Sequence, residues 1–424
     1  MISKSYNFSF TDFFQKKILY PKDLNELKKL LKKKHTIVGN LRSYGDSCIG
    51  ENYHISLKNF NNILNIKKNE KLVEVQAGLK LFKLLDFLME EKFIVKCVPG
   101  CKFVTIGGMI ANDIHGKLSV NNNFKNYVKS LKIIHKGRII SCSKNKNKKI
   151  FDMTIGGKGL TGPIISAVLR VQKVKSNKIL QTNLIFNNFE KFENNLNYIK
   201  NYDYAVIWLN FLNKNFSGIF FLGKHWDKNE ITPKTQNSIK LNNYIIKILS
   251  SFVYTRIFLK LFNFFFFIKN ILIKKKLIHV SEFFFPQNKI LNWNNVFKKN
   301  GFLQFHFYLK KNQLLKLISQ LKNILELNNI CSNFVIIKIH ETQNKKISNF
   351  SLSLDIPLKE KKNKLIKDLN YFVKKNNLIV NLSKDIVLDE INLKTLEKNK
   401  IFNKSNSKFI NKNSSSKLFE RLKT

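Results

Sequence analysis

The sequence predicts an α+β protein with two domains, and three observations carry this prediction. The chain has 424 residues, more than one ordinary hydrophobic core accommodates. Helix-like and strand-like patterns alternate over its first third. Beyond residue 175 glycine nearly vanishes while asparagine and phenylalanine increase, so we place a domain boundary near residue 175.

The individual elements follow from the spacing of the apolar residues. Residues 22–34 and 79–92 repeat leucine at helical spacing, which predicts two amphipathic helices. Alternating or continuous apolar runs bounded by Gly, Pro or polar residues predict strands. These strand-like runs are 35–39, 72–78, 93–100, 127–143 and 163–174. The amino-terminal domain should therefore mix helices with strands.

The charge balance bears on possible partners. The chain holds 75 Lys and Arg against 28 Asp and Glu, a formal charge of +47. The cations are spread over the whole sequence, together with many Asn, Ile and Phe, as a coding bias toward AT-rich codons would produce. Because no nucleic-acid-binding motif accompanies the charge, we expect no nucleic-acid partner. The surplus of positive charge still favours an anionic ligand.

The five cysteines are Cys48, Cys97, Cys101, Cys142 and Cys331. They are odd in number, form no CxxC pair and lack a matched His spacing, so neither a disulfide framework nor a metal site is expected. The first residues lack the basic start and apolar run of a secretory signal. We therefore expect a cytoplasmic protein in a reducing compartment, with peripheral contact to the inner membrane left open.

Three small-residue loops carry the functional signal. They are RSYGDS (42–47), PGCKFVTIGGMIANDIHGK (99–117) and TIGGKGLTG (154–162). Glycines in such loops let backbone N–H groups approach a pyrophosphate closely. One such loop is weak evidence, because structural turns are also rich in glycine. Three of them within one domain are more specific.

In this order the loops resemble the FAD-binding domain of the vanillyl-alcohol oxidase and p-cresol methylhydroxylase (PCMH) superfamily. With GFLQFHF (301–307), they are similar to the bacterial decaprenylphosphoryl-ribose 2-oxidase family and its FAD-linked oxidase relatives. The resemblance implies a PCMH-type FAD domain of two α/β subdomains over 1–175 and a sheet-and-helix substrate (cap) domain over 176–379. Residues 380–424 would return to the FAD domain, and the flavin would lie between the domains.

The resemblance also implies a set of cofactor-binding positions, which lie in or beside the three loops. They are Gly39, Arg42, Ser43, Tyr44, Gly45, Asp46, Pro99, Thr105, Gly107, Gly108, Asn112, His115, Gly116, Ile155, Gly159, Thr161, Gly162 and Ile164. Covalent members of the superfamily carry a flavin-bonding histidine in the first loop, where this chain has SYGDSC. Non-covalent FAD is therefore expected.

The catalytic candidates are Lys384, Tyr44 and His115. Lys384 matches a family lysine beside the flavin and Tyr44 the active-site tyrosine, and His115 could hydrogen-bond cofactor or substrate. Near the flavin a lysine could act as a base or stay charged and support the reduced cofactor. The sequence leaves these two roles open. On composition alone, Lys384 is one more solvated lysine, and the alternative for His115 is a structural histidine that bridges loop backbones.

Four further residues match substrate-pocket positions, namely Gln304, His306, Lys338 and Ser353. Gln304 and His306 alternate along one expected strand, so both side chains should point the same way. Ser353 stands where the resembled family carries cysteine, and this departure weakens the case that the substrate is the same. Leu41 stands where the family has glycine, and this departure should tighten the first loop.

The apolar stretch 242–276 is broken by Lys247, Arg256, Lys260 and Lys269, so a membrane-spanning helix is not expected. Two interpretations remain open. The segment either lies on a membrane surface through an aromatic face with a basic rim, or forms a buried helix pair beneath the substrate domain.

Taken together, these features predict an FAD-dependent oxidoreductase that oxidises a sugar hydroxyl to a ketone. The resemblance points to the 2-hydroxyl of a polyprenylphosphoryl-ribose-like, lipid-linked or phosphorylated sugar, with the product passing to a short-chain reductase partner. One alternative is a soluble aldonolactone or alditol oxidase. The other is a non-catalytic, basic membrane- or nucleic-acid-binding protein whose flavin site has decayed.

Overall fold

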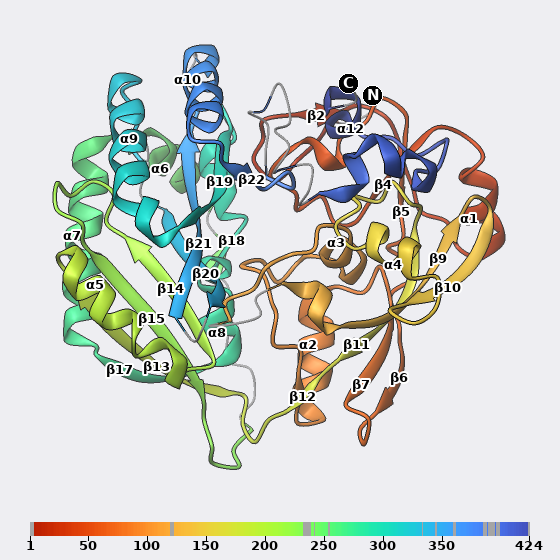
Figure 1. The fold of residues 1–424 in the computed structure, drawn as a ribbon, viewed down its shortest axis with the longest axis horizontal. Helices are drawn as coiled ribbons and strands as arrows, with labels where there is room; N and C mark the ends of the chain where they lie inside the picture. The colour runs from red at the N-terminus through yellow and green to blue at the C-terminus, as the bar shows by residue number, and fades with distance from the viewer. Residues whose placement is uncertain are drawn as a thin grey trace. The chain divides into compact units, whose positions relative to one another are not determined.

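The computed structural model describes residues 4–118, 123–231, 239–240, 242–252, 255–332, 334–343, 346–358, 362–384, 388, 395 and 399–422. The chain divides into two compact units. Unit 1 comprises Met1–Gly116, Asn123–Val174 and Leu382–Thr424, and unit 2 comprises Lys117–Asn122 and Lys175–Asn381. Both units contain helices and strands, so the mixed α and β content is confirmed (Figure 1). The two α/β subdomains and the cap role remain predictions.

Unit 1 contains a short parallel sheet and a longer antiparallel one. The parallel sheet has the order β3-β5-β4, formed by Ile18–Leu19, Tyr53–Ser56 and His35–Val38. The antiparallel sheet has the order β10-β9-β11-β7-β6, formed by Arg138–Ser143, Val128–His135, Ile164–Arg170, Leu72–Gln76 and Ile63–Lys67. Two strand pairs complete the unit, β1 (Ser5–Tyr6) with β2 (Phe13–Phe14) and β8 (Phe93–Ile94) with β12 (Gln172–Lys173).

The α-helices of unit 1 whose bounds the structure describes connect and cover these strands. They are α1 (Leu24–Leu30), α2 (Leu81–Glu90), α3 (Ile106–Ala111), α4 (Lys148–Thr154) and α12 (Lys417–Leu422). Asp23 caps α1 by accepting hydrogen bonds from the backbone N–H groups of Asn25 and Glu26, each at 2.8 Å. The leucine spacing of α2 buries Leu81, Leu84, Leu85 and Leu88, as the periodicity predicts.

The strand predicted over 93–100 was wrong for most of its length. Only Phe93–Ile94 pairs, with Gln172–Lys173 of β12, and the chain then leaves the ladder toward Pro99. A proline cannot donate a ladder hydrogen bond, and the apolar run is buried as loop instead. The run 127–143 forms the hairpin β9-β10, whose turn at Lys136 and Gly137 has φ angles of 49° and 78°.

Unit 2 is built on an eight-stranded, antiparallel sheet. Its order is β17-β13-β15-β14-β20-β21-β19-β22. The strands in that order are Lys275–His279, Lys178–Phe186, Gly218–His225, Tyr204–Leu209, Val335–Gln343, Lys346–Pro357, Phe302–Lys310 and Ile379–Val380. A two-residue pair, β16 (Ile239–Lys240) with β18 (Ile290–Leu291), lies outside this sheet.

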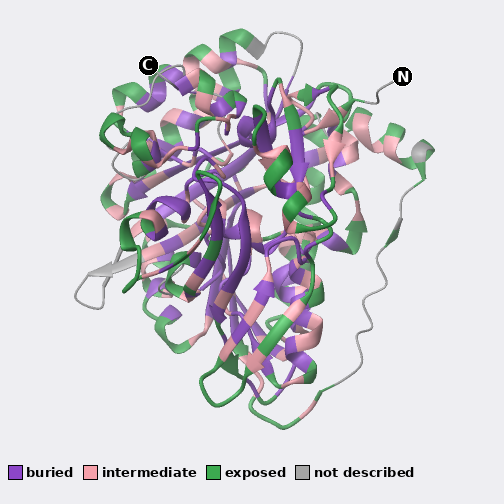
Figure 2. Ribbon diagram, turned by 90° about the vertical axis from the view of Figure 1, so that its right-hand side faces the viewer, coloured by how far each residue is buried: buried purple, intermediate pink, exposed green. Residues whose placement is uncertain are grey.

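The helices of unit 2 are α5 (Phe189–Leu196), α6 (Asn243–Phe252), α7 (Arg256–Leu272), α8 (Val280–Phe284), α9 (Leu314–Leu327) and α10 (Lys362–Lys375). Phe372 of α10 packs against Phe305 and Phe307 of β19, with ring centroids 6.2 and 5.6 Å apart. Strands β14 and β19 are buried almost throughout, and across the molecule buried residues concentrate on strands (Figure 2). The sheet therefore forms the core of the unit.

Short 3-10 turns occur in both units. They cover Asp46–Cys48, Phe124–Tyr127, Ile199–Asn201, Pro286–Lys289, Trp293–Phe297, Lys311–Gln313, Lys400–Phe402 and Lys404–Phe409. In the part of the chain that the structure describes, every helix is too short or too polar to cross a bilayer.

The alternative that residues 242–276 form a buried helix pair was wrong. The segment does form two helices, α6 and α7, but most of their large apolar side chains are exposed.

Candidate cofactor and substrate site

The first loop leaves β4 at Gly39 and lies against the second loop. A Cβ atom at Gly39 would lie 2.4 Å from the Thr105 Oγ1, so only glycine allows this approach. The Asn40 side chain donates to the Phe103 carbonyl over 2.9 Å. Leu41 adopts a φ of 50°, a left-handed conformation that costs a leucine about 1 kcal/mol. Leu41 therefore occupies a backbone conformation that glycine would adopt without this cost.

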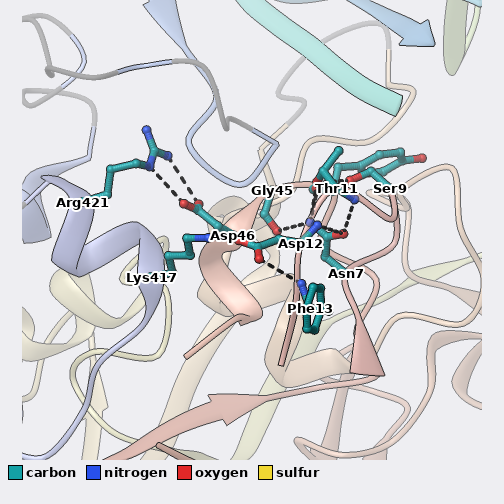
Figure 3. Close-up of polar contacts among 10 residues, drawn as sticks. Asn7, Ser9, Thr11, Asp12, Phe13, Gly45, Asp46, Lys417 and Arg421 are labelled. Atoms are coloured by element: carbon teal, nitrogen blue, oxygen red, sulfur yellow. Dashed lines mark hydrogen bonds and ion pairs between the residues drawn. The ribbon is translucent and has the colours of Figure 1, made fainter. Parts of the chain in front are cut away.

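Asp46, at the end of the first loop, is held by residues from near the carboxyl terminus. Arg421 donates from its Nε to the buried Asp46 carboxylate at 3.0 Å, and Lys417 pairs with Asp12 at 2.5 Å (Figure 3). The Asp46 side chain therefore serves the fold, and binding of a ligand at this position would fall to the backbone.

The second loop surrounds helix α3. Thr105 caps this helix by accepting from the Gly108 N–H at 3.2 Å, and the Asn112 side chain donates to the Gly108 carbonyl at 2.9 Å. Gly107 packs closely on Ala77, since a Cβ atom there would lie 3.0 Å from the Ala77 Cβ. His115 is buried beyond the helix, in a β-bridge with Asn123.

The third loop packs against the same helix. The N–H groups of Gly156 and Lys158 donate to the carbonyls of Ile110 and Ala111 at 3.0 and 2.9 Å. Gly162 has a φ of 117°, and a Cβ atom there would lie 2.0 Å from the Ile134 carbonyl oxygen. The three loops, far apart in the sequence, therefore converge on α3 within unit 1.

Each loop contributes one buried polar atom that has no hydrogen-bond partner among the described residues. These atoms are Arg42 Nε in the first loop, Asn112 Oδ1 in the second and Thr161 Oγ1 in the third. Buried polar atoms are normally paired, so an unpaired one calls for an explanation such as an absent ligand. The Arg42 Nε is a cationic donor, the Thr161 hydroxyl can donate or accept, and the Asn112 Oδ1 accepts. This set suits a group that carries phosphates, hydroxyls and N–H groups, such as FAD.

The returning segment 382–384 lies beside these loops. Lys158 donates from Nζ to the Ser383 Oγ at 2.5 Å, and the Lys384 Nζ lies 5.5 Å from the centroid of the Tyr44 ring. Burial lowers the pKa of Lys158 to about 8, although nearby Asp113 acts in the opposite direction. Two cations and the first-loop tyrosine thus gather in one region of unit 1.

In unit 2 the four predicted substrate residues lie on one face of the sheet. His306 of β19 pairs with Ser353 of β21, Lys338 of β20 pairs with Ser351, and Gln304 pairs with Asp355. Alternate residues of a strand share a face, so these pairs line up in successive rows. The Gln304 Nε2 donates to the Asp355 Oδ1 at 2.5 Å, and the Gln304 Oε1 has no partner among the described residues.

This polar face includes residues that the sequence interpretation missed. Asp355 is buried, and His340 accepts from or donates to the Ser351 Oγ at 2.8 Å. The alternation in SLSLDIP and FVIIKIH could have identified both, because each lies two residues from a predicted pocket residue.

Lys117, which follows the predicted His115 and Gly116 directly in sequence, was also missed. Its Nζ is buried in unit 2 and donates to the Phe283 carbonyl at 2.8 Å. Desolvation lowers the pKa of Lys117 to about 7. Among so many lysines, its position beside the HG pair was the one available signal.

The fold and these loops define a protein that binds a dinucleotide-like cofactor in glycine-rich loops around a short helix. Residues 16–143 match the family model of the FAD binding domain. These residues therefore carry an FAD binding domain, which confirms FAD as the cofactor, and the similar oxidases support the recognition of an FAD-linked oxidase relative.

Several curated proteins are similar to parts of the chain. The decaprenylphosphoryl-beta-D-ribose oxidase of Mycolicibacterium smegmatis is 34% identical over 31% of this chain and 29% of that protein. The D-arabinono-1,4-lactone oxidase of Kluyveromyces lactis is 24% identical over 40% of this chain and 35% of its own length. The L-gulonolactone oxidase of Mus musculus is 24% identical over 49% and 47%. The chain thus spans between about a third and a half of these relatives.

The close approach at Gly162 yields a testable prediction. Gly162→Ala should lower the free energy of unfolding by about 3 kcal/mol or more, since the new methyl group meets the Ile134 carbonyl at a left-handed φ. Gly137→Ala is the matched control, because Gly137 also has positive φ but open space around it, and should cost about 1 kcal/mol. Urea unfolding measures the loss of free energy of unfolding in each variant. Equal losses would contradict the steric explanation.

Lys117 makes stability depend on pH. Its pKa is lower in the folded state, so between about pH 7 and 10.5 the unfolded chain binds more protons, and stability should rise with pH. Between pH 7 and pH 10 the free energy of unfolding of Lys117→Met should rise by on the order of 3 kcal/mol less than that of the wild type. The surplus positive charge of the chain also makes stability rise with pH. Lys224→Met, at an exposed lysine, therefore serves as the control. A rise equally large in all three proteins would refute the assignment.

Proposed function

We propose that the protein is an FAD-dependent oxidoreductase that holds FAD non-covalently and oxidises a hydroxyl group of a sugar-like substrate to a ketone. The observation that carries the proposal is the convergence of three glycine loops on α3, each with one buried polar atom lacking a partner. The family match over residues 16–143 supports the cofactor. The absence of histidine from the first loop supports non-covalent attachment.

When bound, FAD supplies the acceptor for the hydride leaving the carbon that bears the hydroxyl. The residues of unit 1 would hold it: Arg42 and the loop amides would bind its phosphates, Asn112 would accept from its N–H or hydroxyl groups, and the Thr161 hydroxyl could donate or accept. Lys384 stands over the Tyr44 ring at 5.5 Å and would either take the hydroxyl proton or keep a positive charge beside the cofactor.

Unit 2 would bind the substrate through its polar sheet face. Gln304, His306 and Ser353 offer donors and acceptors suited to sugar hydroxyls, and Lys338 adds a cation. We propose a polyprenylphosphoryl-ribose-like sugar oxidised at its 2-hydroxyl, in keeping with the similarity to the mycobacterial oxidase. A short-chain reductase would then consume the keto product. We further propose a cytoplasmic location.

A second candidate is the oxidation of a free aldonolactone. It is favoured by the similarity to the arabinonolactone and gulonolactone oxidases, the latter over 49% of this chain. Ser353 is compatible with either substrate. Anaerobic reduction of the enzyme-bound flavin by lactones but not by phosphorylated sugars would select this candidate.

The proposal is tested by the visible absorption spectrum of the purified protein before and after acid precipitation. Flavin bands that pass into the supernatant are the expected result. Flavin that stays with the precipitate would contradict non-covalent attachment. A protein that remains colourless after FAD is added would overturn the enzyme and favour a binding protein with a decayed flavin site.

Lys384 provides a kinetic prediction. Lys384→Ala should slow substrate-driven flavin reduction by at least about a hundred-fold, the usual size of a lost acid–base or electrostatic contribution, while FAD stays bound. Tyr44→Phe should slow it less. Lys412→Ala, an exposed lysine of the same segment, is the control. Loss of FAD from the Lys384 variant would show that the residue binds the cofactor instead.

A further inference from the structure

Helix α7 of unit 2 turns its asparagines toward the protein and its large apolar residues toward solvent. Asn263 and Asn270 are 2% and 8% exposed, whereas Ile257, Phe265 and Leu272 are 75%, 65% and 78% exposed. An ordinary surface helix has the opposite arrangement, with its apolar stripe on the core. The arrangement of α7 therefore calls for a second apolar environment outside the unit.

The inward orientation of α7 is fixed by specific contacts. The Asn263 Nδ2 donates to the Asn210 Oδ1 at 2.8 Å, and the Asn183 Nδ2 donates to the Asn270 Oδ1 at 3.1 Å. Phe266 meets Trp208 edge to face, with ring centroids 5.0 Å apart. A helix rotated to bury its outward phenylalanines would leave these amides unpaired, at a cost of about 1 to 3 kcal/mol each.

The outward residues form a continuous stripe, which we call the outer face of α7. It consists of Ile257, Leu261, Phe264, Phe265, Ile268 and Leu272, all exposed. At 3.6 residues per turn these six positions lie within an arc of about 100°. Lys260 and Lys269, both exposed, lie just beyond the two edges of this arc. The stripe is thus apolar in the middle and cationic on both sides.

The surroundings of the outer face are cationic as well. Residues 231–281 contain nine Lys and Arg and no Asp or Glu. Arg256 pairs with Glu326 of α9 at 3.1 Å, on the exposed surface. Helix α6 adds exposed apolar residues, among them Tyr244 and Phe252, and Phe252 contacts Phe258 of α7 at a centroid distance of 5.9 Å.

We propose that the outer face of α7, with α6, docks on the surface of a bilayer rich in anionic lipid. The aromatic and aliphatic side chains would enter the boundary between headgroups and acyl chains, while Lys260 and Lys269 would reach lipid phosphates on either side. The proposal goes beyond the proposed oxidoreductase function and does not depend on it, because no flavin-site residue takes part.

Charge decides between a bilayer and a second copy of this chain. A two-fold interface would place the outer face against itself and bring its cations together without a carboxylate from residues 231–281. Anionic lipid instead supplies the missing negative charge, at about 1 kcal/mol for each Lys or Arg near the surface.

The test is flotation of the purified protein with vesicles of phosphatidylcholine, with and without about one third phosphatidylglycerol. The wild type should float with the anionic vesicles. Phe264→Ser/Phe265→Ser keeps every charge and should bind these vesicles at least about ten-fold more weakly, because two aromatic side chains no longer leave water. Lys260→Gln/Lys269→Gln should weaken binding to anionic vesicles only.

The matched control is Leu327→Ser/Tyr371→Ser, which removes two comparably exposed apolar side chains from α9 and α10. This variant should bind vesicles like the wild type, and thermal unfolding checks that all variants are folded. Undiminished binding by the phenylalanine double variant would mean that the surplus charge alone attracts lipid, and would overturn the proposal. A wild type that does not bind vesicles would overturn the proposal too. If that wild type is also a dimer by sedimentation and Phe264→Ser/Phe265→Ser is a monomer, the outer face of α7 joins two copies of the chain.

Discussion

The close approach of chain segments at three glycines is the constraint on which unit 1 depends. Gly39 lies against Thr105, Gly107 lies against Ala77, and Gly162 lies against the Ile134 carbonyl, each where a side chain would collide. Such contacts bring segments from distant parts of the sequence close together. The same three loops carry the buried polar atoms of Arg42, Asn112 and Thr161 that have no partner among the described residues.

The sequence was sufficient wherever a local pattern has one structural solution. The glycine loops, the Asp23-capped helix and the alternation of Gln304 and His306 along β19 belong to this class. The strand predicted at 93–100 failed because an apolar run can be buried as loop as readily as strand. A helix pair was one of the two interpretations of 242–276, but the sequence could not say which side of α7 faces inward. That depends on Asn183 of β13 and on Asn210, which directly follows β14.

Buried lysines were hidden for a different reason. Lys117 and Lys158 have pKa values lowered to about 7 and 8 by desolvation, yet they are two lysines in a chain where that residue is everywhere. Composition gives no means of separating a buried lysine from a solvated one. The same abundance makes the overall charge a poor guide to partners, whereas the placement of Lys260 and Lys269 beside the outer face of α7 is specific.

The return of residues 382–422 to unit 1 has a kinetic consequence. Asn411 donates to the Thr161 carbonyl and accepts from the Lys136 N–H, and Ser414 forms a bridge with His35, contacts that span between about 250 and 380 residues of sequence. Closing such long loops is slow, and during synthesis the third loop and β4 must wait while all of unit 2 is made. Unit 2 can therefore fold first. The three glycine loops of unit 1 are then completed late in the synthesis of the protein.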